Sequence, residues 1–364
     1  MQSDRALYPE AMPVALQIRR VDPFDAADHD RWWHAYAAAK RADMGEDALV
    51  WTLEESRAEM QQRSAATERR TYVALRDGVV VGAGSLALGL KDNLHAAALG
   101  VTVPAEHRRR GVGSALLAHI EAEARDAGRR TFRAETAWPA SAPDDGRGQP
   151  GIEFARRHGY ALALGDLQNR LTLPVADRII DGLWHEALHE GENKDETAPA
   201  SAAAEYGIRS WVGPVPEEFV AEWAALDAVL DTEAPTGDLD IEAAVADVAD
   251  HRADEALQQA QGRTSFGTVA VAPDGRVAAY TQLVVSGDDG NAYQWGTLVR
   301  REDRGHGLGL RVKLANLRML QQHSPHVPRI YTYNAESNAH MLAVNSRLGF
   351  MATGRLGELQ KRIG

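Results

Sequence analysis

The sequence of 364 residues contains no cysteine. Without a thiol, the chain has no disulfide framework, no thiolate ligand for a metal ion and no cysteine nucleophile. Any chemistry that passes through a cysteinyl thioester is therefore excluded.

Long apolar segments are also missing. No segment approaches the roughly 18 to 20 consecutive apolar residues that span a bilayer, and the N-terminus carries no basic stretch followed by an apolar one. We therefore expect a cytoplasmic protein without a membrane partner.

Basic residues are fewer than acidic ones. The chain has 52 acidic residues against 40 lysines and arginines, which gives a formal net charge of -12. This charge argues against a nucleic-acid partner and is compatible with cationic small molecules. The length suits two domains, each large enough to bury its own core, and the sequence gives no indication of the oligomeric state.

What the sequence does contain is one glycine motif in two copies. Arg-x-x-Gly-x-Gly occupies residues 108–113 and again residues 304–309, and Gly100 precedes the first copy by the same offset as Gly296 precedes the second. Each copy follows a strand-like run and opens a helix-like run, so its backbone N–H groups can bind a pyrophosphate at a helix N-terminus. The spacing is neither that of a P-loop nor that of a dinucleotide fingerprint. Two copies in register predict two copies of one domain.

The order of elements also repeats. In the first unit we expect a strand at 14–20, helices at 29–42 and 53–67, strands at 71–76 and 79–88 joined by an Asp-Gly turn, a strand at 96–103, a helix at 114–127, a strand at 130–137, a helix at 151–158 and closing strands through residue 173. In the second unit we expect a strand at 208–211, helices at 217–230 and 241–261, strands at 264–271, 277–285 and 292–299, and a helix at 310–322.

Between the units lie a helix and a linker. Apolar residues at helical spacing from 179 to 188 predict a helix that packs between domains, and residues 191–205, rich in charge, Ala, Ser and Pro, are typical of a linker. We therefore divide the chain into an N-terminal domain at 1–174, a helix and linker at 175–205, and a C-terminal domain at 206–364.

The element order, the two glycine motifs and the segment NAESNAHMLAVNSRLGF at 334–350 resemble the GNAT superfamily of N-acetyltransferases. The resemblance implies an α/β class (an α+β mixed sheet) with two tandem GNAT-like domains, each a mixed central sheet flanked by helices. Two fused copies are similar to the tandem acetyltransferases, of which mycothiol synthase is an example. In this family the motif binds the pyrophosphate of acetyl-coenzyme A, and the preceding strand pairs with its pantetheine arm.

The resemblance also implies which residues bind acetyl-CoA. In the second copy these are Thr297, Leu298, Val299, Arg304, Gly305, His306, Gly307, Leu308, Gly309, Leu310, Asn334 and Asn338. In the first copy they are Val101, Thr102, Val103, Arg108, Arg109, Arg110, Gly111, Val112, Gly113 and Ser114. Only the second copy has the Asn-x-x-x-Asn approach, so we expect the C-terminal domain to be catalytic and the first copy to bind the cofactor without turnover or to act as a scaffold.

The proton-transfer groups depart from the family pattern. The tyrosine that serves as acid in the family is replaced by Asn345, which can hydrogen-bond a thiolate but cannot protonate it. Tyr333 or Tyr331 on the preceding strand can take the acid role or merely pack the sheet. The carboxylate found in related tandem enzymes at the start of the fourth strand is replaced by Asn291, with His95 at the same offset in the first copy.

Several other groups remain open as the base. By chain order they are Asp227, Asp231, Glu233, Asp288 and Asp289, each of which is otherwise a solvated surface acid. His306 we interpret as a backbone contributor to its loop.

We therefore expect an acetyl-CoA-dependent N-acetyltransferase that acts on a small-molecule amine by direct transfer in a ternary complex. A mycothiol synthase-like acetyltransferase is an alternative within the class. A non-catalytic CoA-binding sensor or interaction protein is the alternative outside it, since the family's acid is missing in both copies.

Overall fold

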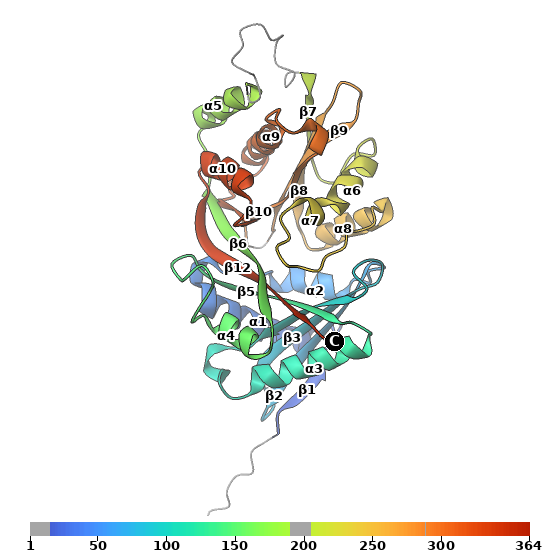
Figure 1. Cartoon of the computed structure of the whole chain (residues 1–364), viewed down its shortest axis with the longest axis vertical. Helices are drawn as coiled ribbons and strands as arrows, with labels where there is room; N and C mark the ends of the chain where they lie inside the picture. The colour runs from blue at the N-terminus through green and yellow to red at the C-terminus, as the bar shows by residue number, and fades with distance from the viewer. Residues whose placement is uncertain (1–14, 190–204, 288) are drawn as a thin grey trace, which may run out of the picture.

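The computed structural model describes residues 15–189, 205–287 and 289–364 (Figure 1). Its strands are β1 (Gln17–Arg20), β2 (Thr67–Arg76), β3 (Val79–Gly89), β4 (Ala96–Thr102), β5 (Thr131–Pro139), β6 (Ala161–Thr172), β7 (Gly207–Val212), β8 (Thr264–Val271), β9 (Val277–Val285), β10 (Ala292–Val299), β11 (Arg329–Ala335) and β12 (Met351–Arg362). Its α-helices are α1 (Ala26–Met44), α2 (Leu53–Gln61), α3 (Val112–Asp126), α4 (Pro150–Arg157), α5 (Asp177–Leu188), α6 (Val220–Ala228), α7 (Leu230–Glu233), α8 (Val248–Ala260), α9 (Leu308–His323) and α10 (Ala339–Leu348).

All these strands form one mixed sheet in the order β1-β2-β3-β4-β5-β12-β6-β11-β10-β9-β8-β7. The order is symmetric about the β12–β6 pair, as expected for two copies of one unit. This confirms the mixed α/β class with helices on both faces of the sheet.

The two halves complete each other's sheet. β12, at the end of the chain, pairs with β5 of the first half, and β6 of the first half pairs with β11 of the second. β6 and β12 run side by side through the middle of the molecule (Figure 1). We expected closing strands in the plural before residue 173, and this was wrong: β6 is a single strand, and its neighbour comes from the other end of the chain. The proposed boundaries at 174 and 206 stay a prediction.

Most expected elements are present, and local chemistry explains their limits. The Asp77-Gly78 turn has positive φ at both residues, as a two-residue hairpin requires. The expected helix at 53–67 ends at Gln61, because the chain there turns into β2. The expected helix at 241–261 begins only at Val248, since Asp247 caps it by accepting a hydrogen bond from the Ala249 N–H.

Three expectations concern residues without a described placement. Val14, at the start of the first expected strand, lies outside the described residues, as do residues 191–204 of the expected linker and Asp288.

Helices cover the two faces of the sheet in matching ways. In the first half, α3 and α4 cover one face with a core that includes Leu116, Ile120, Phe132 and Ile152, while α1 packs on the opposite face. In the second half, α9 and α10 take the first face and α6 packs on the opposite one. α5 packs on the same face as α9 and α10, through the apolar residues whose helical spacing predicted this helix.

A buried ion pair links the two halves on the other face. Arg263, just before β8, donates to Glu55 at the start of α2 over 2.8 Å, and both side chains are almost fully buried. The guanidinium also lies 4.4 Å from the Trp51 ring, so cation–π attraction adds to the pair. The two halves therefore share a desolvated polar contact as well as a common sheet.

Candidate functional site

The first glycine loop is open at the start of α3. Gly111 and Arg109 both have left-handed backbone, and a Cβ placed on Gly111 would meet no atom within 4 Å. Arg109 and Arg110 are exposed, and in the described part of the chain their guanidinium groups have no ion-pair partner. Backbone N–H groups, the helix dipole and two free cations thus face the same open space, which suits a pyrophosphate.

The second loop has the same backbone but a different neighbour. Gly305 and Gly307 have positive φ, and α9 begins at Leu308. A Cβ on Gly307 would overlap the carbonyl oxygen of Ala187, near the C-terminal end of α5. α5 therefore covers the start of α9 with a carbonyl group, which repels an anion. This arrangement argues against the expectation that the second copy binds the cofactor for turnover.

The leading arginine of each motif holds its loop in place. The Arg108 guanidinium forms a bidentate pair with Asp43 of α1 at 2.7 and 2.9 Å, and its Nε donates to the Val103 carbonyl. Arg304 repeats the pattern with the Val299 carbonyl and Glu233 of α7. Because these guanidinium groups already have carboxylate partners, they position the loops, and in the first copy Arg109 and Arg110 are the loop arginines without an ion-pair partner among the described residues.

In both copies, the two parallel strands beside the glycine loop separate. The parallel pair β4–β5 is in register only from Ala96–Leu99 against Thr131–Ala134, and the pair β10–β11 only at Ala292 and Tyr293. Beyond these residues the strands separate. A register shift between Gln294 and Thr297 interrupts the β9–β10 ladder in the second copy. Two diverging strand pairs are thus available to take an extended ligand along their free backbone groups.

The remaining expected strand residues have ordinary structural contacts. Thr102 donates to the Ala83 carbonyl, Thr297 and Thr281 share a hydrogen bond of 2.7 Å, and Leu298 is buried in a core cluster. The His306 ring lies 5.7 Å from the ring of Tyr206.

The asparagines of the second copy form a buried polar chain with a lysine that the sequence did not single out. Asn345 donates to Asn334 over 2.6 Å and accepts from Lys313 Nζ over 2.9 Å. Burial lowers the pKa of Lys313 to about 7. Asn338 caps α10 through the Met341 N–H. A lone lysine among the apolar residues of a helix was the signal for Lys313, but only the fold shows that its partner is Asn345.

The tyrosines of β11 lie on the other face of the strand. Tyr333 donates to Gln168 over 2.7 Å, and burial followed by nearby Glu135 raises its pKa well above the usual range. Tyr331 donates to Asp47 over 3.3 Å. The two catalytic candidates, Tyr333 and Asn345, therefore lie on opposite sides of β11, because alternate residues of a strand face opposite sides and Asn345 contacts Asn334.

Most of the expected bases have partners. Asp227 accepts from Tyr280, Asp289 accepts from Tyr293, and Glu233 pairs with Arg301 and Arg304. Burial raises the pKa of Asp231.

His95 and Asn291 likewise have polar neighbours. The His95 ring lies 3.5 Å from Asp240 and 3.6 Å from Glu242. The Asn291 N–H donates to Asp289.

Three carboxyl groups that the sequence analysis missed gather on the central strands. Glu135 on β5 and Glu358 on β12 are direct cross-strand partners, and Asp166 lies on the neighbouring β6. Burial, and then the neighbouring carboxylates, raise the pKa of Asp166 to about 6 and that of Glu358 to about 7. Charged residues inside strands were a weak signal, since only the exchange of β6 and β12 makes them neighbours.

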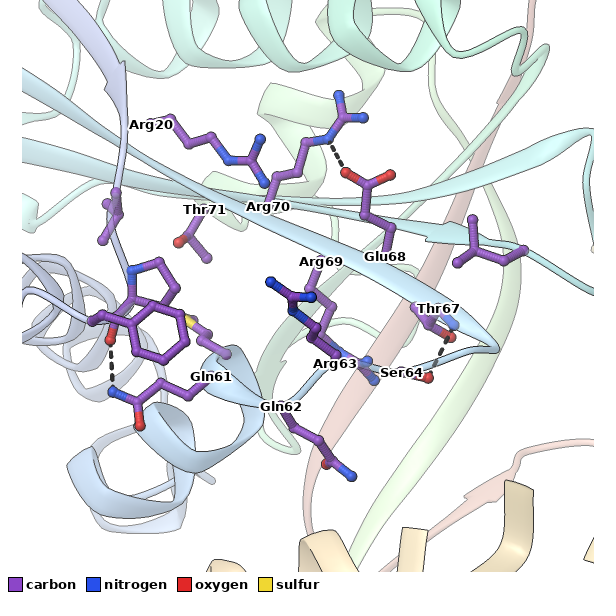
Figure 2. A pocket seen from close by; sticks show the side chains of 15 residues that line it. Arg20, Gln61, Gln62, Arg63, Ser64, Thr67, Glu68, Arg69, Arg70 and Thr71 are labelled. Atoms are coloured by element: carbon purple, nitrogen blue, oxygen red, sulfur yellow. Dashed lines mark hydrogen bonds and ion pairs between the residues drawn. The ribbon is translucent and has the colours of Figure 1, made fainter. Parts of the chain in front are cut away.

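A separate cavity of about 480 Å³ lies between α2 and β2 (Figure 2). Arg20, Arg63, Arg69 and Arg70 line it, but Arg70 pairs with Glu68 and Glu123. It lies at the N-terminal end of β2, whereas Arg76 at the other end contacts the first loop. At about 3.3 Å per residue, the cavity and the first glycine loop are roughly 20 Å apart, so this cavity is separate from the loop.

In the described ranges, no helix is both long and apolar enough to cross a membrane. No group of His, Asp and Glu in the same ranges is arranged to hold a metal ion.

Comparison with known families identifies relatives of the fold. The model of the acetyltransferase (GNAT) family matches residues 29–141. A search of curated proteins returned no match.

Solved structures extend the likeness over almost the whole chain. A tandem GNAT protein from the clavulanic acid biosynthesis pathway, in a structure without AcCoA, is 27% identical with a TM-score of 0.74, covering 96% of this chain and 99% of its own. A GCN5-related N-acetyltransferase from Sphaerobacter thermophilus is 16% identical with a TM-score of 0.61, covering 96% of both chains. A glucosamine N-acetyltransferase region of a fungal β-N-acetylglucosaminidase is 16% identical with a TM-score of 0.62, covering 96% of this chain and 38% of that one.

Proposed function

Because the chain belongs to the GNAT superfamily of N-acetyltransferases, with two copies of the fold in tandem, we propose that it acetylates a small-molecule amine with acetyl-CoA. Use of an acyl-CoA donor follows from the family. The acetyl donor, the amine acceptor, direct transfer in a ternary complex and the cytoplasmic location are the proposed refinements.

The observation that carries the proposal is the open loop of the first copy. Its exposed Arg109 and Arg110, with the N–H groups at the start of α3, complement the charge of a pyrophosphate, and the space beside Gly111 is open. The separating ends of β4 and β5 lie beside it and offer backbone groups for an extended arm. We therefore propose that the first copy holds the cofactor for turnover, in place of the second copy favoured by the sequence pattern.

When bound, acetyl-CoA supplies an activated acyl carbon, so the amine nitrogen bonds to that carbon as the C–S bond breaks and the thiolate leaves. The amine must first lose a proton, since an alkylamine with a pKa near 10 is protonated at about pH 7. Glu358, with a pKa of about 7 and directly opposite Glu135 on the neighbouring strand, is suited to accept it. Once bonded to the acyl carbon, the nitrogen must give up a second proton. The leaving thiolate, whose conjugate acid has a pKa of roughly 8.5, can take up one proton through water, so the reaction releases one proton in total.

The second copy then has a supporting role. α5 covers its loop, and Lys313 and Asn345 fill the space between α9 and α10 with a satisfied polar chain. Through β12 this half contributes Glu358 to the face of the sheet that carries Glu135.

The test measures free thiol released from acetyl-CoA with a panel of primary amines, together with calorimetric titration of coenzyme A. We expect amine-dependent thiol release and one binding site that depends on Arg110. Binding without release for any amine would instead favour a CoA-binding sensor.

A further inference from the structure

The central strands carry their carboxyl groups on one face of the sheet. Glu135 of β5 lies directly opposite Glu358 of β12, and Leu356, two residues before Glu358, lies opposite Asp166 of β6. Residues two apart on a strand share a face, so all three carboxyl groups point to the same side. Tyr333 of β11 shares that face, since Asp166 and Gln168 pair with Ala335 and Tyr333.

Charge on this face is strongly unbalanced. Asp231 of α7 and the Arg133 guanidinium of β5 are also close to Glu358. The charge of Asp231 raises the pKa of Glu358, and that of Arg133 lowers it. The charge of Glu336 also raises the pKa of Asp166, but the Glu336 carboxylate is already paired with Arg355. Among the described residues, the remaining carboxyl groups thus outnumber the guanidinium group that acts on them, that of Arg133.

Within the described part of the chain, the side chains of these carboxyl groups have no hydrogen-bond or ion-pair partner. Asp166 is only 9% exposed, yet within the described residues its side chain has no hydrogen-bond or ion-pair partner. Like charges directly opposite one another on a sheet are destabilising, and an unpaired buried carboxylate costs more. Among the described residues, no cation other than Arg133 acts on Glu358, and none acts on Asp166, so these carboxyl groups lack a neutralising cation.

That cation is not a metal ion, because the carboxyl groups of the described chain are too dispersed to ligate one. Glu135 is exposed, so the group is reachable from solvent. Glu135 is also the first residue of β5 beyond its paired segment with β4, where the two strands begin to separate. One end of the acidic group thus adjoins the separating ends of β4 and β5, where we propose that the acyl-bearing arm of the cofactor lies, and Asp166 lies further from this point.

We propose that this acidic group, made of Glu135, Asp166, Asp231 and Glu358, binds an acceptor with at least two amino groups. One amino group is held as an ammonium ion near Asp166 while the other is acetylated near Glu135. The inference rests on the proposed function and names its substrate class, an alkyl diamine or polyamine.

The first experiment compares n-butylamine with 1,4-diaminobutane and spermidine in the thiol-release assay. A second ammonium ion paired with a desolvated carboxylate should raise kcat/KM at least about tenfold for the diamine over the monoamine. Equal values for the two would overturn the inference while leaving the proposed function intact. No release with any amine would overturn the proposed function, and calorimetric binding of spermidine would then decide the inference separately.

The second experiment uses Asp166→Asn and Glu358→Gln, with Glu218→Gln as a control. Glu218 is an exposed acid without a described partner on the second half. We expect the first two variants to weaken spermidine binding at least about tenfold with coenzyme A affinity unchanged, and the control to change neither. Both isosteric changes remove charge repulsion, so the fold should survive. Unchanged spermidine affinity in both variants would contradict the inference.

Discussion

The carbonyl oxygen of Ala187 in α5 lies against Gly307 in the second glycine loop, whereas the equivalent Gly111 in the first loop has no atom within 4 Å of its Cβ position. Two loops of the same sequence pattern therefore differ in access. At the N-terminus of α9, α5 occupies the space that an anion could take. At the N-terminus of α3, the same space is open.

Charge reversal at the matched loop positions tests this difference. Arg110→Asp should weaken coenzyme A binding by about tenfold to a hundredfold, because charge-assisted contacts contribute roughly 1.5–3 kcal/mol. His306→Asp, at the equivalent place in the covered loop, should leave affinity unchanged in calorimetry. The reverse result would return the cofactor to the second copy.

Alanine at the two glycines tests the contact with α5. Gly111→Ala should cost about 1 kcal/mol of unfolding free energy, since its only defect is a side chain at positive φ. Gly307→Ala adds an overlap with Ala187 and should cost about 1–3 kcal/mol more. Urea denaturation of both variants measures the difference, and equal losses would show that α5 does not sit on this loop.

Tyr333→Phe separates a structural tyrosine from a catalytic acid. Its hydroxyl group is committed to Gln168, so we expect a loss of about 1 kcal/mol in stability and turnover within a few-fold of wild type. A loss of a hundredfold in kcat at unchanged coenzyme A affinity would support the acid role that the sequence suggested.

Lys313→Met should change how stability depends on pH. The pKa of Lys313 is about 7 in the folded chain and near roughly 10.4 when unfolded, so between these values the unfolded chain binds a proton that the folded chain lacks. Wild-type stability should rise with pH across this window. The stability gain of Lys313→Met should be largest below pH 7 and shrink toward about pH 10. A gain that is independent of pH in thermal unfolding would contradict the buried, neutral lysine.

Glu55→Gln tests the ion pair between the halves. Removing one charge from a buried pair leaves Arg263 uncompensated and should cost about 3–5 kcal/mol. Asp145→Asn, which breaks an exposed pair with Arg147, should cost less than about 1 kcal/mol. Comparable losses in both would show that the pair at α2 is solvated.

The repeated glycine motif, the turn at Asp77-Gly78 and the alternation of apolar residues are local properties, and from them the sequence by itself determined the element order, the tandem repeat and both loops. Which loop is open depended on where α5 packs, and the neighbours of Asp166, Glu358 and Asn345 depended on the exchange of β6 and β12. These contacts join residues far apart in the chain, so the local periodicity of the sequence cannot predict them. Only the tertiary structure brought the unpaired carboxyl groups together.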